Sequence, residues 1–249
     1  MALILTENFE AAGYDAAGWT ESVGVGSTVN EDAATTLPNS PPGWGSQCLQ
    51  IIKAASVDAY SFNALASPVI SYSAFEVVIT AVSPTLGNNL VLGLDAGGTL
   101  VLWGLFFSPD GGVQTLQFVV VPGALGGAGG PSLIPWSAKL NLGQVYHFEV
   151  KWDTTNDQWG LWVDGVFIDG GSLTGTAATT PLTLYLFGDL ASDPGTFTAY
   201  FDLVRVDNAN FIGPLIEKNR RVSTRRIRDS MMDSEDEGHF NELDVKNWW

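Results

Sequence analysis

Apolar and polar residues alternate along much of this chain, and the clearest example is residues 145–153, VYHFEVKWD. One side of that pattern is apolar: Tyr146, Phe148, Val150 and Trp152. The residues between them are mostly polar or charged. Successive side chains of a β-strand point to opposite faces of the sheet, so this period of two predicts a strand with one buried face.

Turn signals separate the apolar runs. Asp164-Gly165 lies between residues 161–163 and 166–168, which are both apolar. An Asp-Gly pair favours a type I′ turn, because that turn needs a positive φ at both central residues. Glycine-containing segments at 95–98 and 108–112 separate further apolar runs. These signals predict antiparallel hairpins.

The same reading along the chain predicts an all-β domain with no helix before residue 213. Strands are expected near Leu5–Phe9, Cys48–Lys53, Tyr60–Leu65, Phe75–Val82, Leu90–Leu94, Thr99–Phe107, Gln114–Val121, Val145–Asp153, Trp159–Val163, Val166–Ile168, Leu182–Phe187 and Thr198–Val206. Residues 101–107 are apolar at nearly every position, which indicates burial on both faces. Two segments rich in proline or glycine, Thr36–Gly45 and Pro122–Pro135, are predicted loops.

Charge divides the chain into a domain at residues 1–213 and an arm at residues 214–249. The domain carries four basic and 19 acidic side chains, and the arm carries seven basic and eight acidic ones. An acidic body within a chain of net charge −16 repels nucleic acid and anionic membranes, so neither is expected as a partner. No apolar run approaches the roughly 20 residues of a membrane span, and the start lacks the basic segment of a secretory signal. Synthesis in a cytoplasm is therefore expected.

The arm is predicted to be extended or partly helical, because the strand alternation stops and three arginines recur at helical spacing: Arg221, Arg225 and Arg228. The chain ends on Trp248 and Trp249, and tryptophan is a frequent anchor in protein interfaces. Two interpretations carry equal weight. The arginines bind carboxylates of a partner protein or of a second copy, or the arm is a disordered, solvated tail.

Three segments resemble the concanavalin A-like (laminin G-like) jelly-roll superfamily. They are LTENFE at 5–10 before Trp19, the FEVKWD and LWVDGV strands within 148–166, and YFDLVRV at 200–206. Together they span most of residues 1–210. The resemblance implies a sandwich of two curved antiparallel sheets with the first and last strands adjacent. Its members include glycan-binding modules, glycosidases, adhesion domains and structural proteins of bacteriophage particles, so the fold alone does not define the function.

The residues that catalysis needs are scarce in this chain. Cys48 is the single cysteine, which excludes an intrachain disulfide, and it is expected to be a small buried side chain. His147 and His239 are the two histidines, and His147 is expected on the exposed polar face of its strand. Glucanases of the resembled superfamily carry a Glu-x-Asp-x-x-Glu motif on one strand, and no predicted strand has it. The sequence therefore predicts no catalytic residue and no enzyme.

Binding sites have more candidates. Trp44 and Trp136 lie in the loop-rich segments, where an exposed ring could stack on a sugar. Four other tryptophans fall on predicted strands and are expected to pack in the core: Trp103, Trp152, Trp159 and Trp162. The resemblance also implies a calcium ion where the first and last strands meet, with Glu7, Glu10 and Asp202 as oxygen ligands. No other cofactor is expected.

The leading hypothesis is a non-enzymatic structural protein of a viral particle, such as a bacteriophage capsid decoration or fibre-like protein located in the virion. The jelly roll would project from the particle, and the arm would bind viral structural proteins or further copies of the chain. Weak contacts repeated across such an assembly give strong net retention. The alternative is a lectin-like module that binds surface glycans, and a divergent hydrolase is a third hypothesis.

Overall fold

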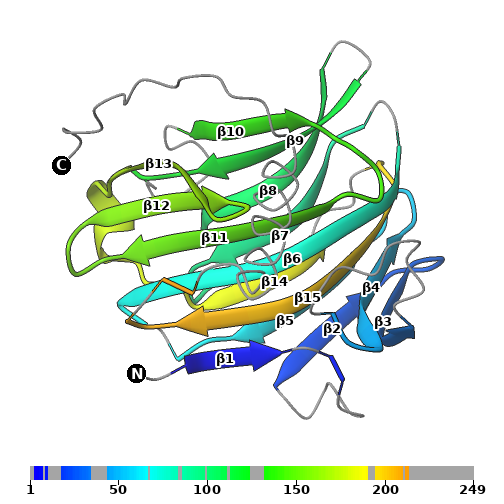
Figure 1. Ribbon diagram of the computed structural model, residues 1–249, viewed down its shortest axis with the longest axis horizontal. Coiled ribbons are helices and arrows are strands. Elements are labelled where there is room, and N and C mark those ends of the chain that lie inside the picture. Colours follow the sequence, from blue (N-terminus) through cyan, green and yellow to red (C-terminus); the bar gives the residue numbers. More distant parts are fainter. Residues whose placement is uncertain are drawn as a thin grey trace, which may run out of the picture. The chain divides into compact units, whose positions relative to one another are not determined.

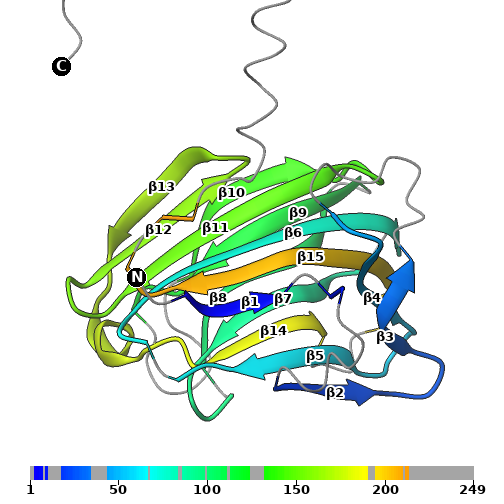
Figure 2. The same ribbon diagram turned by 60° about the horizontal axis from the view of Figure 1, so that its bottom comes forward.

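The computed structural model describes residues 3–7, 9–10, 18–34, 44–66, 68–83, 86–98, 100–110, 113–123, 132–189, 194–209 and 211–212. These residues form two antiparallel sheets stacked face to face as a β-sandwich (Figures 1 and 2). The predicted all-β jelly-roll fold is confirmed. Residues Met1–Pro214 make one compact unit, and the arm from Leu215 lies outside the described residues.

The eight strands of sheet A are β1 (Leu3–Glu7), β3 (Thr28–Ala34), β4 (Gln47–Lys53), β6 (Ile70–Val82), β11 (Val145–Asp153), β12 (Gln158–Val163), β13 (Val166–Ser172) and β15 (Phe197–Asp207). The seven strands of sheet B are β2 (Trp19–Val23), β5 (Ala59–Ala64), β7 (Asn88–Leu94), β8 (Val101–Asp110), β9 (Val113–Val120), β10 (Leu133–Lys139) and β14 (Leu184–Asp189). A short 3-10 helix, η2 (Gly175–Thr179), connects β13 to β14.

Sheet A has the strand order β13-β12-β11-β6-β15-β4-β3, and sheet B has the order β10-β9-β8-β7-β14-β5-β2. The first strand, β1, pairs with the last, β15, with Leu5 opposite Val206. Adjacent first and last strands are what the resemblance implied. The largest strands of sheet A, β6 and β15, lie side by side at its middle.

The core between the sheets is built from aromatic rings. Phe75 of β6 stacks on Phe148 of β11, and Trp103 of β8 stacks on Phe118 of β9. Tyr185 of β14 contacts both stacks through ring edges. Apolar rings of this size dominate the energy of a core, because each removes a large area from water. Three of the tryptophans predicted in the core are there, namely Trp103, Trp152 and Trp159.

The hairpin that joins β12 to β13 confirms the turn read from Asp164-Gly165. Both residues have positive φ, 52° for Asp164 and 77° for Gly165. The backbone N–H of Asp164 donates to the carbonyl oxygen of His147, and the Asp164 side chain accepts from the His147 N–H. The turn is therefore held against β11 as well as closing its own hairpin.

The sequence did not predict β2, β3 or β10 as strands. The first residues of β10 fall in a predicted loop. Each of the three is the edge strand of a sheet. An edge strand is covered on fewer sides, so it carries polar residues and a weaker alternation than a central strand.

No helix among the described residues has the length and apolarity that crossing a membrane requires.

Candidate functional site

The outward face of sheet A carries charged and aromatic side chains from five adjacent strands. Directly opposed residues of antiparallel strands share a face, so the pairing register defines which side chains are neighbours. One row across the sheet contains Asp202, Glu76 and His147. The next row contains Arg205, Ala74, Glu149, Trp162 and Phe167. We term the β15–β6–β11 part of these rows, with Glu76, His147, Glu149, Asp202 and Arg205, the closed centre.

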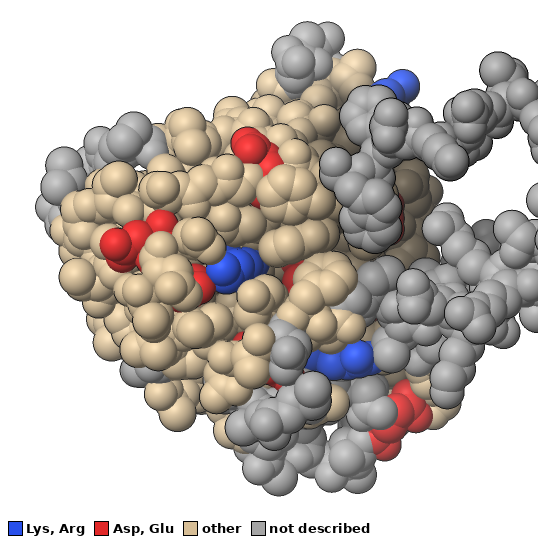
Figure 3. All heavy atoms as spheres, turned by 60° about the vertical axis from the view of Figure 1, so that its left-hand side comes forward, with Lys and Arg blue, Asp and Glu red and all other residues tan. Residues whose placement is uncertain are grey.

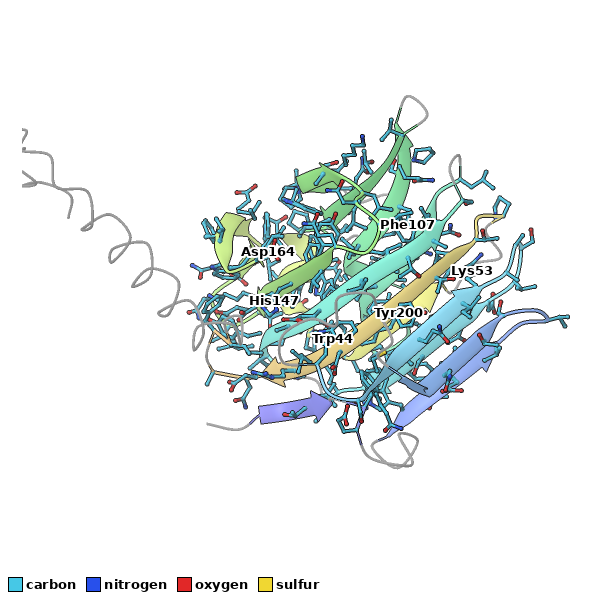
Figure 4. All side chains as sticks on the ribbon, turned by 45° about the vertical axis from the view of Figure 1, so that its right-hand side comes forward. Trp44, Lys53, Phe107, His147, Asp164 and Tyr200 are labelled. Carbon is cyan, nitrogen blue, oxygen red and sulfur yellow. The ribbon has the colours of Figure 1, made fainter. Side chains whose placement is uncertain are left out.

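Trp44 covers the closed centre from above. Its indole Nε1–H donates to Glu76 Oε2 at 2.7 Å, and its ring packs on Cys48, Val78 and Leu203. Figure 4 shows Trp44 on the same side of sheet A as His147. His147 Nδ1 lies 3.5 Å from Glu76 Oε1, and His147 is buried. The histidine expected to be exposed is therefore enclosed, because a tryptophan from another segment covers this part of its strand.

The chain that follows β15 covers the other side of the closed centre. The backbone N–H of Ile212 donates to Glu149 Oε1 at 2.6 Å, and the N–H of Ala209 donates to Asp207 Oδ1 at 2.7 Å. Glu149 and Asp207 are both buried. Hydrogen bonds from backbone donors stabilise such carboxylates when water is excluded.

A β-bulge in β15 places Asp202 in the closed centre. The register of β15 against β6 shifts between Asp202 and Arg205, and Leu203 has a φ of 53°, in the left-handed region that non-glycine residues seldom adopt. Burial, with a smaller contribution from the negative charges of Glu76 and Glu10, raises the pKa of Asp202 to about 7. The Leu203 N–H, which donates to Asp202 Oδ1, opposes that rise.

Arg205 is the cation of the closed centre. Burial lowers its pKa, and the nearby charges of Glu76, Asp202 and Glu149 counter that effect. Three acidic side chains thus act electrostatically on one guanidinium. Four buried atoms of this group have no hydrogen-bond partner among the described residues: Glu76 Oε1, His147 Nδ1, His147 Nε2 and Asp202 Oδ2. The closed centre combines a covered position with incompletely satisfied polar atoms, which is costly in a protein interior.

The end of the same face formed by β12 and β13 is open. A hollow of about 380 Å³ lies there, and its walls include the rings of Trp162 and Phe167. These rings meet edge to face with centroids 5.3 Å apart, and Phe167 is 58% exposed. Phe211, from the segment that leaves β15, contacts the Trp162 ring at 5.0 Å. This aromatic groove exposes flat apolar surface beside polar strand ends.

Glycines form the floor of the aromatic groove. Gly160 of β12 and Gly170 of β13 are paired neighbours on the outward face. A Cβ on Gly160 would lie 2.9 Å from the Trp162 ring, and a Cβ on Gly170 would lie 3.2 Å from the Phe167 ring. Both rings therefore occupy space that a side chain at these positions would fill. Because glycine has no side chain, the rings pack close to the backbone of β12 and β13.

Polar side chains border the aromatic groove on the β11 side. Lys151 Nζ donates to Gln158 Oε1 at 2.9 Å and lies 3.1 Å from Asp153 Oδ2. Burial alone would raise the pKa of Asp153, but hydrogen bonds from Asn156 and the Lys151 charge outweigh it and lower the pKa. The groove thus has a charged pair fixed by hydrogen bonds at one side and aromatic rings at the other.

The residues singled out from the sequence lie in several places. Trp44 is covered, with 8% of its surface exposed, and the half-buried Trp136 packs its ring against Phe148 and Tyr146. Glu10 accepts hydrogen bonds from Ser46 and Gln47, and its charge acts on Asp202. The side chain of Glu7 lies outside the described residues, as do Arg221, Arg225, Arg228, Trp248 and Trp249.

Within the part of the chain that the structure describes, no three His, Cys, Asp or Glu side chains converge as a metal site. With Glu7 not described, calcium binding stays a prediction. Cys48 is buried as expected, and burial together with the charges of Asp202 and Glu10 raises the pKa of its thiol to about 12.

The sequence-based reading did not identify Trp162 and Phe167 as binding candidates. A signal was present, because Trp162 falls out of phase with the apolar positions Trp159, Leu161 and Val163 of its strand. An aromatic residue on the polar face of an amphipathic strand is a better binding candidate than one in a proline-rich loop. The closed centre was also missed, since its members come from β6, β11 and β15.

No family model matches the sequence, and no curated protein sequence does either. Solved structures match it at low identity. The chain is similar to a sialidase at 13% identity and a TM-score of 0.57, covering 84% of this chain and 19% of the sialidase chain. It is also similar to Cip1, a cellulose-induced protein, at 17% identity and a TM-score of 0.58, covering 84% of this chain and 99% of Cip1.

An alginate lyase from Pseudomonas aeruginosa matches at 13% identity and a TM-score of 0.50, over 64% of this chain and 82% of the lyase. The chain thus spans about a fifth of the sialidase it matches and nearly all of Cip1. At these identities the likeness shows the fold alone, which is a jelly-roll β-sandwich.

Proposed function

We propose that this domain binds a carbohydrate in the aromatic groove of β12 and β13, without chemical turnover. The observation that carries the proposal is the half-buried Trp162 beside the exposed Phe167, both lining the hollow over a glycine floor. The apolar faces of pyranose rings stack on such aromatic rings, and a few fixed polar groups then orient the sugar hydroxyls. Lys151, Gln158 and Ser172 border the groove and supply those polar groups.

Neutral glycans suit this groove better than polyanions. The Lys151 ammonium is already paired with Asp153, and the domain around it is acidic. On the side of the molecule in Figure 3, uncharged surface predominates and Lys or Arg side chains are few. A uronate polymer would meet net repulsion, whereas a neutral sugar would not.

Binding without turnover is favoured because the carboxylates of the closed centre and of Asp153 already accept hydrogen bonds from within the protein. Hydrolysis of a glycosidic bond usually needs two carboxyl groups that both reach the sugar. The carboxylates of the closed centre lie beneath Trp44 and the Ile212 backbone and are engaged in internal hydrogen bonds. The carboxylate beside the groove, Asp153, accepts hydrogen bonds from Asn156.

The test is calorimetric titration of the full chain with cello-, xylo- and manno-oligosaccharides, and with alginate oligomers as the anionic comparison. At least one neutral series is expected to bind, and Trp162→Ala is expected to weaken that binding at least about tenfold through the loss of stacking area. Tyr60→Ala is the matched control, since Tyr60 is a partly buried aromatic residue on the outward face of sheet B. Its affinity should equal that of the wild type.

Two outcomes would contradict the proposal. One is the absence of binding across all neutral series, and the other is equal affinity for wild type and Trp162→Ala. Release of new reducing ends from any of these sugars would contradict the absence of turnover.

The virion role inferred from the sequence is compatible with this proposal and stays a prediction. It depends on Arg221, Arg225, Arg228, Trp248 and Trp249, which lie outside the described residues. Light scattering of the full chain and of residues 1–213, at low and high salt, tests it. Salt-sensitive multimers of the full chain alone would support an assembly arm.

A further inference from the structure

A lysine and an aspartate meet in the interior between the two sheets. Lys53 is the last residue of β4, and Asp189 is the last residue of β14. Lys53 Nζ lies 3.3 Å from Asp189 Oδ2, and both side chains are 0% exposed. In Figure 4, Lys53 lies toward the opposite end of sheet A from His147. The contact therefore joins sheet A to sheet B and is separate from the carbohydrate site proposed above.

The groups around this pair include an amide, two carbonyls and aromatic rings. Asn89 Nδ2 of β7 donates to Asp189 Oδ1 at 3.0 Å. Lys53 Nζ also donates to the carbonyl oxygens of Gly195 at 2.9 Å and of Ala54 at 3.4 Å. Phe197 is directly opposite Lys53 in the register of β4 and β15, and its ring contacts Phe107. The pair is held by several strands in a site without access to water.

A buried ion pair of this kind is an expensive way to hold two sheets together. Removing both charges from water often costs more free energy than their mutual attraction returns. Residues 1–213 contain only four basic side chains, and one of them belongs to this pair. Elimination of water between the ammonium and the carboxylate would remove both charges and leave a neutral amide, which a dry interior accommodates far better.

We propose that Lys53 and Asp189 form an intramolecular amide (isopeptide) cross-link between the two sheets. Nζ passes one proton to Oδ2, and the resulting amine attacks Cγ of the carboxylic acid. The bond from Nζ to Cγ forms while the bond from Cγ to Oδ2 breaks. Oδ2 leaves as water with two of the three original Nζ protons, and the third stays on the amide nitrogen. No oxidant, reductant or further reagent takes part.

Three features of the site favour this step. The fold holds nucleophile and electrophile in contact, and such intramolecular positioning is worth effective molarities of about 10⁵ M or more. The Asn89 amide N–H points at Oδ1, the atom on which negative charge develops during attack. Burial removes water from the site and so disfavours hydrolysis of the product.

The cross-link would fix the ends of β4 and β14 to each other covalently. It would close a long loop of chain and lower the entropy of the unfolded state, as a disulfide does. A chain whose single cysteine is Cys48 has no intrachain disulfide for this purpose. The expected consequence is resistance to unfolding.

The experiment is intact mass spectrometry of the purified full chain under denaturing conditions, both fresh and after prolonged incubation in the folded state. The expected mass is that of the sequence less one water molecule, and peptide mapping should recover a branched peptide that contains Lys53 and Asp189. Lys53→Arg should restore the full sequence mass. A wild-type mass equal to that of the sequence at all times would overturn the proposal, whatever the variants do.

A matched control is present in the same chain. Lys151 and Asp153 make a similar contact, at 3.1 Å, but Lys151 is partly open to solvent. Lys151→Arg should therefore leave the mass deficit unchanged, and a branched peptide joining residues 151 and 153 would contradict the role of water exclusion in the reaction. Glycan binding is measured separately, so failure of either proposal is recognised independently of the other.

Discussion

The outward face of sheet A contains two regions, on neighbouring strands of the sheet, that differ in what covers them. The closed centre, with Glu76, His147 and Asp202, is charged and lies under Trp44 and the chain after β15. The aromatic groove, with Trp162 and Phe167, is largely uncharged and open. The titratable side chains are thus enclosed, and the aromatic rings face an open groove.

This difference separates stability from binding. Charged groups under cover affect the free energy of unfolding, because their protonation and hydrogen bonds change when the chain unfolds. Exposed rings contribute little to folding and are available to a ligand. Variants of the closed centre should therefore change stability at constant affinity, and variants of the groove should do the reverse. Four changes test this separation, ordered by the size of the expected effect.

Asp202→Asn should have the largest effect, and it should depend on pH. The pKa of Asp202 is about 7 in the folded state against 3.8 ordinarily. Between pH 3.8 and about 7, Asp202 is protonated in the folded protein and ionised in the unfolded chain. The free energy of unfolding therefore falls as the pH rises through this range. At pH 8 the variant should be more stable than the wild type by up to about 4 kcal/mol, and by less at pH 5. Urea unfolding at both pH values measures this, and an equal difference at both would contradict it.

Trp44→Phe should be next. It keeps an aromatic ring over Cys48 and Val78 but removes the indole donor from Glu76 Oε2. A buried carboxylate that loses a hydrogen bond costs about 1–3 kcal/mol. Thermal or urea unfolding should show this loss while glycan affinity is unchanged. Trp162→Phe serves as the comparison, since its ring lies in the open groove; equal destabilisation by both changes would remove the distinction between the two regions.

Gly160→Ala should act on the aromatic groove alone. The new methyl would lie 2.9 Å from the Trp162 ring, so the ring must rise from the floor. We expect a loss of affinity of about fivefold with little change in stability, because the displaced ring is at the flexible end of its side chain. Gly104→Ala is the matched control on the outward face of sheet B, where a Cβ would meet the Phe106 ring at 2.6 Å. Calorimetry should show that the control binds normally.

Phe211→Ala should have the smallest effect. Its ring supports Trp162 from the segment that leaves β15, at a centroid distance of 5.0 Å. Removing one supporting aromatic contact should weaken glycan binding by about threefold. Titration under the same conditions as Trp162→Ala measures this. A loss as large as that of Trp162→Ala would place Phe211 in direct contact with the sugar.

The sequence alone determined much of the architecture, because strand periodicity and turn preferences are local properties. The alternation at 145–153 predicted β11 with its bounds, and Asp164-Gly165 predicted the turn between β12 and β13. The polar edge strands β2 and β3 were missed, since an edge needs less apolar alternation. Periodicity also assigned His147 and Glu149 to the correct face of β11.

What covers that face was decided by the tertiary structure. His147 was expected on an exposed face, which it shares with Glu149, yet Trp44 and Ile212 cover the closed centre from segments far away in the chain. The aromatic groove likewise depends on Trp162 and Phe167 being brought beside Gly160 and a lysine of β11. Alternation defines which way a side chain points from its sheet. Whether water or another part of the chain lies there depends on long-range packing, which no local pattern encodes.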